Sequence, residues 1–269
     1  MHGPTPLERR SSIRGRARGE GREMLVTFKV FRFDPQRDGA PRFQEYSVEV
    51  KPSDKILDCL NRIRWEQDPS LSFRMSCAHG ICGSDAMRIN GVCAIACQRL
   101  VRDCGEGPIT IEPLPNFRVL KDLMVDLESF FERYRKIRPF LLAPDPPPET
   151  ERLQLPEERA LFDEAVRCIL CACCTAACPV TEENGAFLGP AALLRGYRYL
   201  FDSRDQASAE RISLLDHPDA VWGCKGHGKC TEVCPKEIDV RKWLGRIKKR
   251  VHDAKKGGQR VLPEEGGSK

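Results

Sequence analysis

The sequence predicts an α+β fold in which a small domain built on a β-sheet precedes a mostly α-helical domain. Residues 25–33 and 43–50 alternate apolar and polar side chains over strand lengths. From Pro156 onward the apolar residues instead recur at helical spacing, and the Pro-rich stretch 143–149 separates the two patterns. A chain of 269 residues is long enough for two such domains with separate cores.

The first half is predicted to begin with a β-hairpin. Leu25–Phe33 and Phe43–Val50 are its strands, and the Pro, Gly and Asp residues of Asp34–Arg42 provide its turn. A helix is expected at Lys55–Trp65, with Ser53 as its N-cap. This domain is expected to cover residues 24–142. Further strands are expected at Met87–Asn90 and Ile109–Pro113, followed by a connecting helix at Leu120–Tyr134.

The second half is predicted to be helical, with cysteine runs between the helices. Three successive prolines cannot lie inside a helix, so residues 143–155 are expected to form a stiff linker. The helical domain then covers residues 156–256, and residues 257–269 are expected to be a flexible tail. Its predicted helices are Glu157–Ala165, Pro190–Leu200 and Val240–Val251.

The charge distribution argues against nucleic acid as a partner. The formal net charge is +5, and residues 1–23 contain six Arg against three Glu, so the remainder is nearly balanced. A nucleic-acid module usually carries its basic excess on the folded surface. Residues 1–23 are predicted to be a disordered basic arm, and alternatives are a start of translation at Met24 or an organelle-targeting peptide.

The cysteines indicate bound metal rather than disulfide bonds. Fourteen cysteines crowd into tight runs, and adjacent thiols such as those of Cys173 and Cys174 do not easily pair with each other. No stretch approaches the ~18 to 20 apolar residues that span a bilayer, and no apolar run near the N-terminus resembles a secretory signal. We therefore expect a polypeptide with no transmembrane segment of its own, in a reducing compartment.

The first cysteine motif has the spacing of a plant-type [2Fe–2S] loop. Cys77 and Cys82 are followed by Asp85, where such loops have a third cysteine, and by Cys97 eleven intervening residues further on. A carboxylate carries the same formal charge as a thiolate, so Asp85 is a candidate iron ligand. Cys93 is an alternative to Cys97, and a solvated turn residue is the alternative for Asp85. The predicted ligands are Cys77, Cys82, Asp85 and Cys97.

Two further runs have the spacing of two-cluster bacterial ferredoxins. Residues 168–179 contain the pattern C-x2-C-x2-C-x3-C-P, and residues 224–235 repeat this frame with His227 in place of its second cysteine. In such proteins the fourth cysteine of each run binds the other cluster. The predicted [4Fe–4S] ligands are therefore Cys168, Cys171, Cys174 and Cys234.

The remaining site has one thiolate too few for a cubane. It receives only Cys178, Cys224 and Cys230, and a cubane corner without a ligand tends to lose its iron, so we predict a [3Fe–4S] cluster. The alternative is a [4Fe–4S] cluster with His227 as its fourth ligand. Cys59, Cys93, Cys104 and Cys173 are left over and are expected to be small buried residues. Structural zinc is the other general alternative for a cysteine cluster.

With these residues placed, the chain resembles the iron–sulfur subunits of succinate:quinone oxidoreductases, which include succinate dehydrogenase and fumarate reductase. The resemblance covers roughly residues 24–250. Several independent motifs in the right order are more specific than any one of them. They are Ser76–Asp85, Lys121–Asp126, Cys168–Pro179, Gly189–Ala192, Phe201–Asp205 and Cys230–Pro235.

The resemblance implies both the fold and the role of each half. It implies an N-terminal β-grasp, [2Fe–2S] ferredoxin-like domain followed by a helical two-cluster ferredoxin domain. The first would face an FAD-containing flavoprotein subunit that interconverts succinate and fumarate. The [3Fe–4S] end would face a membrane anchor subunit and its quinone. The chain would thus lie peripherally on the inner face of the cytoplasmic or inner mitochondrial membrane.

Two departures from the family pattern concern the quinone. Many relatives have Trp shortly after the equivalent of Cys178, and many have His directly after the equivalent of Cys224, where this chain has Lys225. Candidate quinone contacts are therefore Pro179, Trp222, Lys225 and His227. The basic segment Arg241–Arg250, with Trp243, is a candidate for contact with the anchor or lipid headgroups, and a solvated face is its alternative.

The function predicted on this basis is one-electron transfer from flavin through [2Fe–2S], [4Fe–4S] and [3Fe–4S] clusters to quinone, as a succinate dehydrogenase subunit. Fumarate reduction in the reverse direction and a freestanding ferredoxin-type carrier are the alternatives. A further alternative is a thiol-linked fumarate reductase or a glycolate oxidase-like assembly, which would typically carry added Cys-Cys-Gly repeats. No residue is predicted to act on succinate itself, because that chemistry would belong to the partner.

Overall fold

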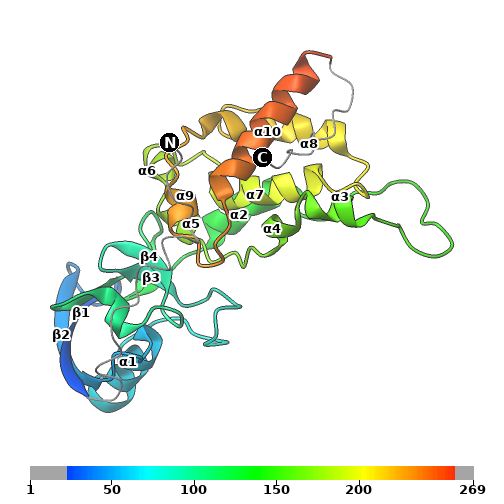
Figure 1. Cartoon of the computed structure of the whole chain (residues 1–269). Coiled ribbons are helices and arrows are strands. Elements are labelled where there is room, and N and C mark those ends of the chain that lie inside the picture. Colours follow the sequence, from blue (N-terminus) through cyan, green and yellow to red (C-terminus); the bar gives the residue numbers. More distant parts are fainter. Residues whose placement is uncertain (1–22, 258–269) are drawn as a thin grey trace, which may run out of the picture.

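The computed structural model describes residues 23–257, and it confirms an α+β fold with the sheet first and the helices second. Figure 1 shows the strands of the sheet and helix α1 (Ile56–Arg62) gathered at one end of the molecule and the helices α2–α10 at the other. Residues 1–22 of the predicted arm and 258–269 of the predicted tail lie outside the described residues.

The first half is a mixed five-stranded sheet in the order β2-β1-β5-β3-β4. Strands β1 and β2 form the expected antiparallel hairpin, and β1 pairs in parallel with β5, with Phe28 opposite Ile109. The sheet consists of β1 (Met24–Arg32), β2 (Arg42–Val50), β3 (Ala86–Ile89), β4 (Val92–Ile95) and β5 (Ile109–Glu112). Sequence reasoning missed β4, which follows the tight turn at Asn90-Gly91.

A helix covers one face of this sheet. It comprises α1 (Ile56–Arg62) and continues as one π-helical turn, Ile63–Gln67. Its apolar side is fully buried with the inward-facing strand residues in one apolar core. The predicted N-cap was wrong, because Lys55 and not Ser53 occupies that position, with no side-chain cap. A 3-10 turn at Val101–Cys104 precedes β5.

The single helix predicted at Leu120–Tyr134 is replaced by a small hairpin and a shorter helix. Strands β6 (Val119–Lys121) and β7 (Met124–Val125) precede α2 (Glu128–Lys136). The cause is Asp122, which takes a positive φ of 48° at the turn and is almost fully buried. Its carboxylate accepts hydrogen bonds from Arg32 Nε and from the backbone N–H groups of Phe33 and Ser72.

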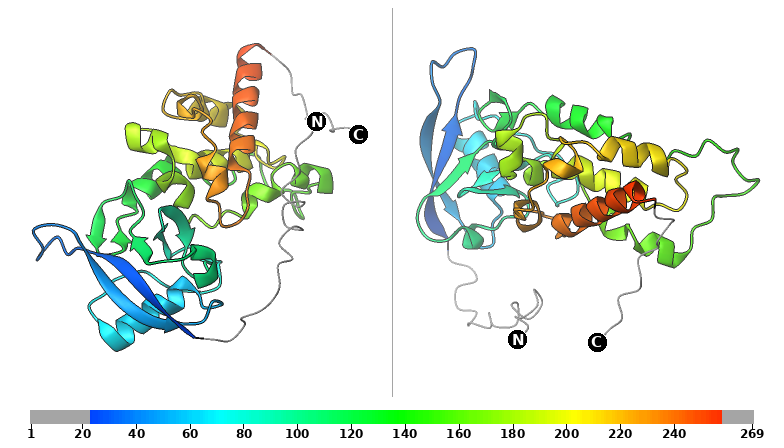
Figure 2. Two further views of the ribbon diagram at one scale, coloured as in Figure 1. Left: turned by 60° about the vertical axis from the view of Figure 1, so that its left-hand side comes forward. Right: turned by 90° about the horizontal axis from the view of Figure 1, so that it is seen from above.

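The second half is a set of helices around a second apolar core. The long helices α7 (Gly189–Leu200) and α10 (Val240–Lys255) pack against each other, and Figure 2 shows them from two further directions. The shorter helices are α3 (Pro156–Ala160), α4 (Asp163–Val166), α5 (Cys173–Ala176), α6 (Pro179–Glu183), α8 (Ser208–Leu215) and α9 (Lys229–Glu232), with a 3-10 turn at Val221–Gly223.

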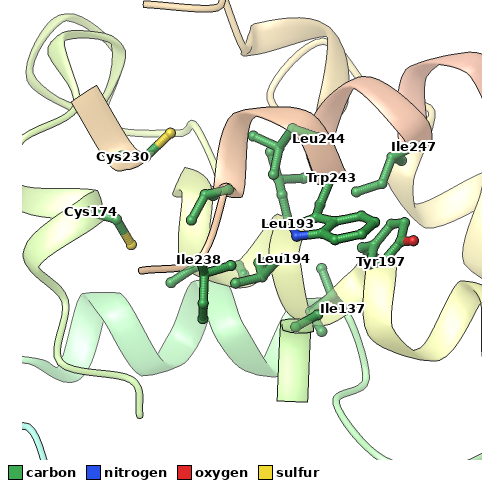
Figure 3. Packing of buried hydrophobic residues seen from close by; sticks show 14 of the residues in the cluster. Ile137, Cys174, Leu193, Leu194, Tyr197, Cys230, Ile238, Trp243, Leu244 and Ile247 are labelled. Atoms are coloured by element: carbon green, nitrogen blue, oxygen red, sulfur yellow. The ribbon is translucent and has the colours of Figure 1, made fainter. Parts of the chain in front are cut away.

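The helical half differs from the prediction in its shorter helices and in the position of Trp243. The helix predicted at Glu157–Ala165 is broken into α3 and α4, and α8 was not predicted. Trp243 does not lie on the outer face of α10, because it is only 5% exposed and packs on Tyr197 with 4.9 Å between ring centroids. Figure 3 shows this packing, with Cys174 and Cys230 beside the apolar core. Residues 143–155 contain no helix or strand, and the predicted domain boundaries stay a prediction.

Candidate functional site

The first site is a loop whose backbone N–H groups converge on sulfur. Cys77 Sγ accepts hydrogen bonds from the backbone N–H groups of His79, Ile81 and Cys82 at 3.3–3.5 Å. These donors, His79 first, lower the pKa of Cys77 to about 6. The loop can wrap this tightly because Gly80 and Gly83 take positive φ values of 80° and 68°. Such a nest of N–H groups stabilises anionic sulfur.

Cys82 completes this half of the site. Its sulfur accepts from the backbone N–H groups of Cys77 and Ser84, both at 3.5 Å, and lies 3.0 Å from the Ser84 hydroxyl oxygen. Cys77 and Cys82 are therefore held by the same short loop, with amide dipoles directed at both sulfur atoms.

Asp85 is buried beside Cys97 at the other side of the loop. Only 2% of Asp85 is exposed, and its Oδ2 accepts a hydrogen bond from Cys97 N at 2.6 Å. Its Oδ1 is buried and has no hydrogen-bond partner among the described residues. A buried carboxylate oxygen with a free lone pair is costly unless something binds it, and an iron ion would satisfy it. Asp85 therefore fits the part of an iron ligand.

Cys97, and not Cys93, lies at this site. Cys97 is fully buried in the core of the sheet domain, and burial together with the Asp85 carboxylate raises the pKa of its thiol to about 12. Cys93 belongs to the core of the helical domain instead. This placement supports the predicted choice of Cys97.

The second site is an apolar cavity that brings together both ferredoxin-like runs. The cysteines predicted to share a [4Fe–4S] cluster, Cys168, Cys171, Cys174 and Cys234, all line it. Leu170 and Ala172 take positive φ values of 54° and 65°, which lets the first run fold back around the cavity. Burial holds the pKa of Cys174 well above its ordinary value, whereas a hydrogen bond from the Cys173 thiol lowers the pKa of Cys171.

The third site is a separate cavity. Cys178, Cys224 and Cys230 line it, as predicted for the incomplete set, and so does His227. Burial raises the pKa of Cys230 to about 11. The cysteines of the second set and those of the third set thus each surround a cavity, and they do not converge on the position of one metal ion. Among residues 23–257, no three His, Cys, Asp or Glu side chains come close enough to hold one metal ion.

The quinone candidates fall into two groups. Pro179, Lys225 and His227 line the third cavity, and Lys225 pairs with Glu183 at 3.0 Å. Trp222 is absent from that lining, and its indole Nε1 donates to Asp216 Oδ1 at 2.6 Å. The structure thus brings three of the four candidates together and leaves Trp222 engaged elsewhere.

Two cations of the basic segment Arg241–Arg250, both on α10, lie beside the third cavity, a place that the sequence did not predict for them. Arg241 lines the cavity, and Lys248 Nζ donates to the backbone oxygen of Cys224 at 2.6 Å. The pair is separated by seven residues, which places both on one side of a helix. That spacing was visible in the sequence, although nothing local showed which side of α10 meets the cysteines.

The leftover cysteines behave as expected of small buried residues in three cases. Cys59, Cys93 and Cys173 are buried, Cys104 is half-buried, and all are free thiols. Burial raises the pKa of Cys59 to about 12 and that of Cys93 to about 11.

Comparison with known proteins assigns an iron–sulfur domain to each half of the chain. Residues 27–132 match a family model described as a 2Fe-2S iron-sulfur cluster binding domain, and residues 164–238 match a 4Fe-4S dicluster domain. Two iron–sulfur domains in this order, each with its cysteines gathered as above, define an iron–sulfur electron-transfer protein.

Individual relatives narrow this class. The succinate dehydrogenase iron-sulfur subunit of Coxiella burnetii (strain RSA 493 / Nine Mile phase I) is 39% identical over 237 residues, covering 87% of this chain and 100% of the relative. The fumarate reductase iron-sulfur subunit of Mycobacterium tuberculosis (strain CDC 1551 / Oshkosh) is 40% identical over 225 residues, covering 83% and 91%. A chain of the Mycobacterium smegmatis Sdh1 complex in the apo form matches with a TM-score of 0.80 and 28% identity, covering 90% and 100%.

The chain belongs to the family of succinate dehydrogenase and fumarate reductase iron–sulfur subunits. It is the electron-transfer subunit of an oxidoreductase complex, and the predicted family and fold class are confirmed.

Proposed function

We propose that the chain conducts single electrons from an FAD-containing flavoprotein subunit to quinone as part of a succinate dehydrogenase. The observation that carries this proposal is the succession of three donor sets, with the first beside the second and the second sharing both cysteine runs with the third. A row of sites across the molecule suits a conductor between two partners, whereas a carrier that docks one partner at a time needs only one exposed site.

The ligand assignment follows from which side chains share each site. Cys77, Cys82, Asp85 and Cys97 would hold the [2Fe–2S] cluster, and Cys168, Cys171, Cys174 and Cys234 the [4Fe–4S] cluster. Cys178, Cys224 and Cys230 would hold a [3Fe–4S] cluster, because their cavity offers three thiols and one imidazole. When bound, these groups supply one-electron carriers.

The residues around the sites would set how readily each accepts an electron. Backbone N–H groups directed at Cys77 and Cys82 stabilise added negative charge. Apolar side chains around the second cavity, such as Leu194 and Ile238, exclude water and make added charge less favourable there. The positive side chains of Arg241 and Lys248 near the third cavity favour the added electron at that end.

The third cavity would also be the end that faces quinone and a membrane anchor subunit. Pro179, Lys225 and His227 line it, and Lys225 and His227 offer polar groups to a quinone oxygen. Trp222 is a weaker candidate because Asp216 accepts its indole hydrogen bond. Within residues 23–257 no helix has the length and apolar character needed to cross a bilayer. We place the chain peripherally on the inner membrane face, held by its anchor.

Fumarate reductase is the second candidate function, because one relative at 40% identity carries that name. The same cluster chain conducts electrons in either direction, so the ligand set does not choose between the two. The partner's dicarboxylate site and the quinone potential decide the direction.

The test is purification of the tagged full-length chain from membranes of its source, solubilised in mild detergent. We expect a flavoprotein and an anchor to copurify, and the sample to reduce a quinone analogue when succinate is added. A chain that purifies alone from the soluble fraction with its clusters intact would instead indicate a freestanding carrier.

A further inference from the structure

The loop of the first site lies directly on a ligand of the second. A Cβ atom built on Gly83 would lie 2.7 Å from Cys171 Cβ, 3.0 Å from its Cα and 3.3 Å from its backbone N. Real Cβ atoms essentially never approach another atom more closely than 3.0 Å. Because the atoms in the way are backbone and Cβ, no side-chain rotation can make room. Only glycine fits here without moving one loop away from the other.

The surroundings show that this contact belongs to a built junction. Gly83, Ser84 and Asp85 of the first loop line one small cavity together with Cys171. Ile169 and Cys171 also pack against the core of the sheet domain. Conversely, Cys93 of β4, a strand of the sheet domain, is 4% exposed and lies in the core of the helical domain. The two halves are therefore packed together through residues of both, Ile169 and Cys171 from the helical half and Cys93 from the sheet half.

We propose that Gly83 is a positioning residue for electron transfer between the first and second sites. Its missing side chain lets the loop that holds the first site touch the backbone of a ligand to the second, which keeps the two sites at their shortest separation. The step moves one electron from the reduced first site to the oxidised second site, with no bond made or broken and no proton transferred. The inference rests on the ligand assignment proposed above.

Comparing Gly83 with Gly80 distinguishes the positioning role of Gly83 from the need for glycine in the turns of the loop. Both glycines take positive φ in the same loop, so alanine strains the backbone at either position. The three atoms nearest to a Cβ on Gly80, however, all belong to the side chain of Gln98, the nearest being Cδ at 2.9 Å, and a flexible side chain can move. Gly80→Ala is therefore the matched control for Gly83→Ala.

The experiment compares electron paramagnetic resonance (EPR) spectra of the two variants and the wild type, each as the full chain reduced with dithionite. In the wild type, the reduced second site should accelerate spin relaxation of the [2Fe–2S] signal. Gly83→Ala should lose most of this acceleration while both clusters remain. Gly80→Ala should keep it, even if some [2Fe–2S] cluster is lost.

The assembled complex gives a second readout. Gly83→Ala should lower kcat for succinate-dependent quinone reduction severalfold, because the electron must cross a wider gap between the first and second sites. The KM for succinate should not change, because the dicarboxylate site lies in the partner. A change in KM with unchanged kcat would overturn the inference.

A second variant guards against the possibility that Gly83→Ala does not fold. Cys93→Leu enlarges a buried side chain at the same junction without touching the first loop, and overpacking there should push β4 away from the helical domain. It should weaken the same spin interaction with the [2Fe–2S] content unchanged. If each variant that folds relaxes as the wild type does, the inference is wrong. If the wild type shows neither cluster signal, the ligand assignment fails first and the inference with it.

Discussion

At the scale of single residues, the most informative position is Asp85, where plant-type loops have a cysteine. Its buried Oδ1 has no partner among the described residues, while Oδ2 is satisfied by Cys97 N–H. One oxygen thus has a structural role and the other is free for iron. A solvated turn residue would be exposed, and Asp85 is not.

Substitution of Asp85 separates these two roles. Asp85→Asn keeps an acceptor for Cys97 N–H and should fold, yet should lose most of the first-site iron because the anionic ligand is gone. Asp85→Ala should in addition lower the free energy of unfolding by about 1–3 kcal/mol, since a buried N–H is left unsatisfied. Asp85→Cys should retain the cluster. The iron content and the EPR signal of the reduced [2Fe–2S] cluster measure how much cluster each variant retains. If Asp85→Ala retained as much [2Fe–2S] cluster as the wild type, the assignment of Asp85 as a ligand would be contradicted.

His227 decides what the third site holds. It occupies the place of a cysteine in the repeated frame and lines the third cavity. His227→Cys supplies the missing thiolate and should convert [3Fe–4S] into [4Fe–4S], so the signal of the oxidised protein should disappear and the potential should fall. His227→Ala is the control and should leave the oxidised signal unchanged. Loss of the cluster in His227→Ala would make the imidazole a ligand.

At the scale of elements, Arg32 joins segments that are distant in sequence. It is almost fully buried on β1 and pairs with Asp68 and Asp122, with Tyr46 as a further partner. Its hydrogen bonds to these carboxylates raise the pKa of Arg32 despite burial, so it is charged at every working pH. This network explains why residues 119–125 fold back onto the sheet.

Arg32→Met should therefore cost about 3–5 kcal/mol in the free energy of unfolding, because two carboxylates lose their buried counter-charge. The exposed pair Arg159–Asp163 offers a matched control, and Arg159→Met should cost no more than about 1 kcal/mol. Urea unfolding of the two variants against the wild type is the measurement. Equal effects would mean that the Arg32 network does not hold the domain together.

In the helical domain, Arg211 likewise joins segments that are distant in sequence. From α8, it donates to both carboxylate oxygens of Asp205 and to the backbone oxygens of Ile137, Arg138 and Phe140. Arg211 is only 1% exposed. It thereby fixes the segment that follows α2, where the chain enters the long connection between the two halves.

Arg211→Met should expose this connection. We expect cleavage by a protease within residues 137–155 to become faster, because the carbonyl groups after α2 lose their donor and Asp205 loses its counter-charge. Arg159→Met again serves as the control. Limited proteolysis followed by mass spectrometry locates the cut, and an unchanged cleavage pattern would contradict this role.

Local sequence patterns predicted the hairpin, α7 and α10 but not the segment after Leu120. Leu120–Tyr134 has apolar residues at helical spacing, and contacts of Asp122 with Arg32, Phe33 and Ser72, which are 90, 89 and 50 residues away, break it into β6, β7 and α2. Such long-range hydrogen bonds cannot be seen in a local pattern. Strand β4 and helix α8 were not predicted either.

The grouping of the cysteines around two cavities could be predicted from the sequence, whereas their surroundings could not. Cysteine spacing is dictated by cluster geometry, so the grouping of Cys168, Cys171 and Cys174 with Cys234 could be worked out by counting. The contact of Gly83 with Cys171 and the approach of Lys248 to Cys224 depend on how the two halves pack. Those relations exist only in three dimensions.

At the scale of the whole molecule, the three candidate sites follow one another, with the first beside the second and the second sharing both cysteine runs with the third. The sheet domain offers the first site in an exposed loop, where Ile81 is 57% exposed, and the helical domain holds the other two inside its cavities. Between them the two cores interlock through Cys93 and Cys171. This arrangement makes the two halves one conductor rather than two tethered ferredoxins.

The most direct test of this account is low-temperature EPR of the purified protein, as isolated and after dithionite, with iron and sulfide assays on the same sample. The account predicts a [3Fe–4S] signal in the oxidised protein and [2Fe–2S] and [4Fe–4S] signals after reduction. An oxidised sample without the [3Fe–4S] signal, together with a second [4Fe–4S] signal on reduction, would contradict the three-thiolate third site and require His227 as a ligand.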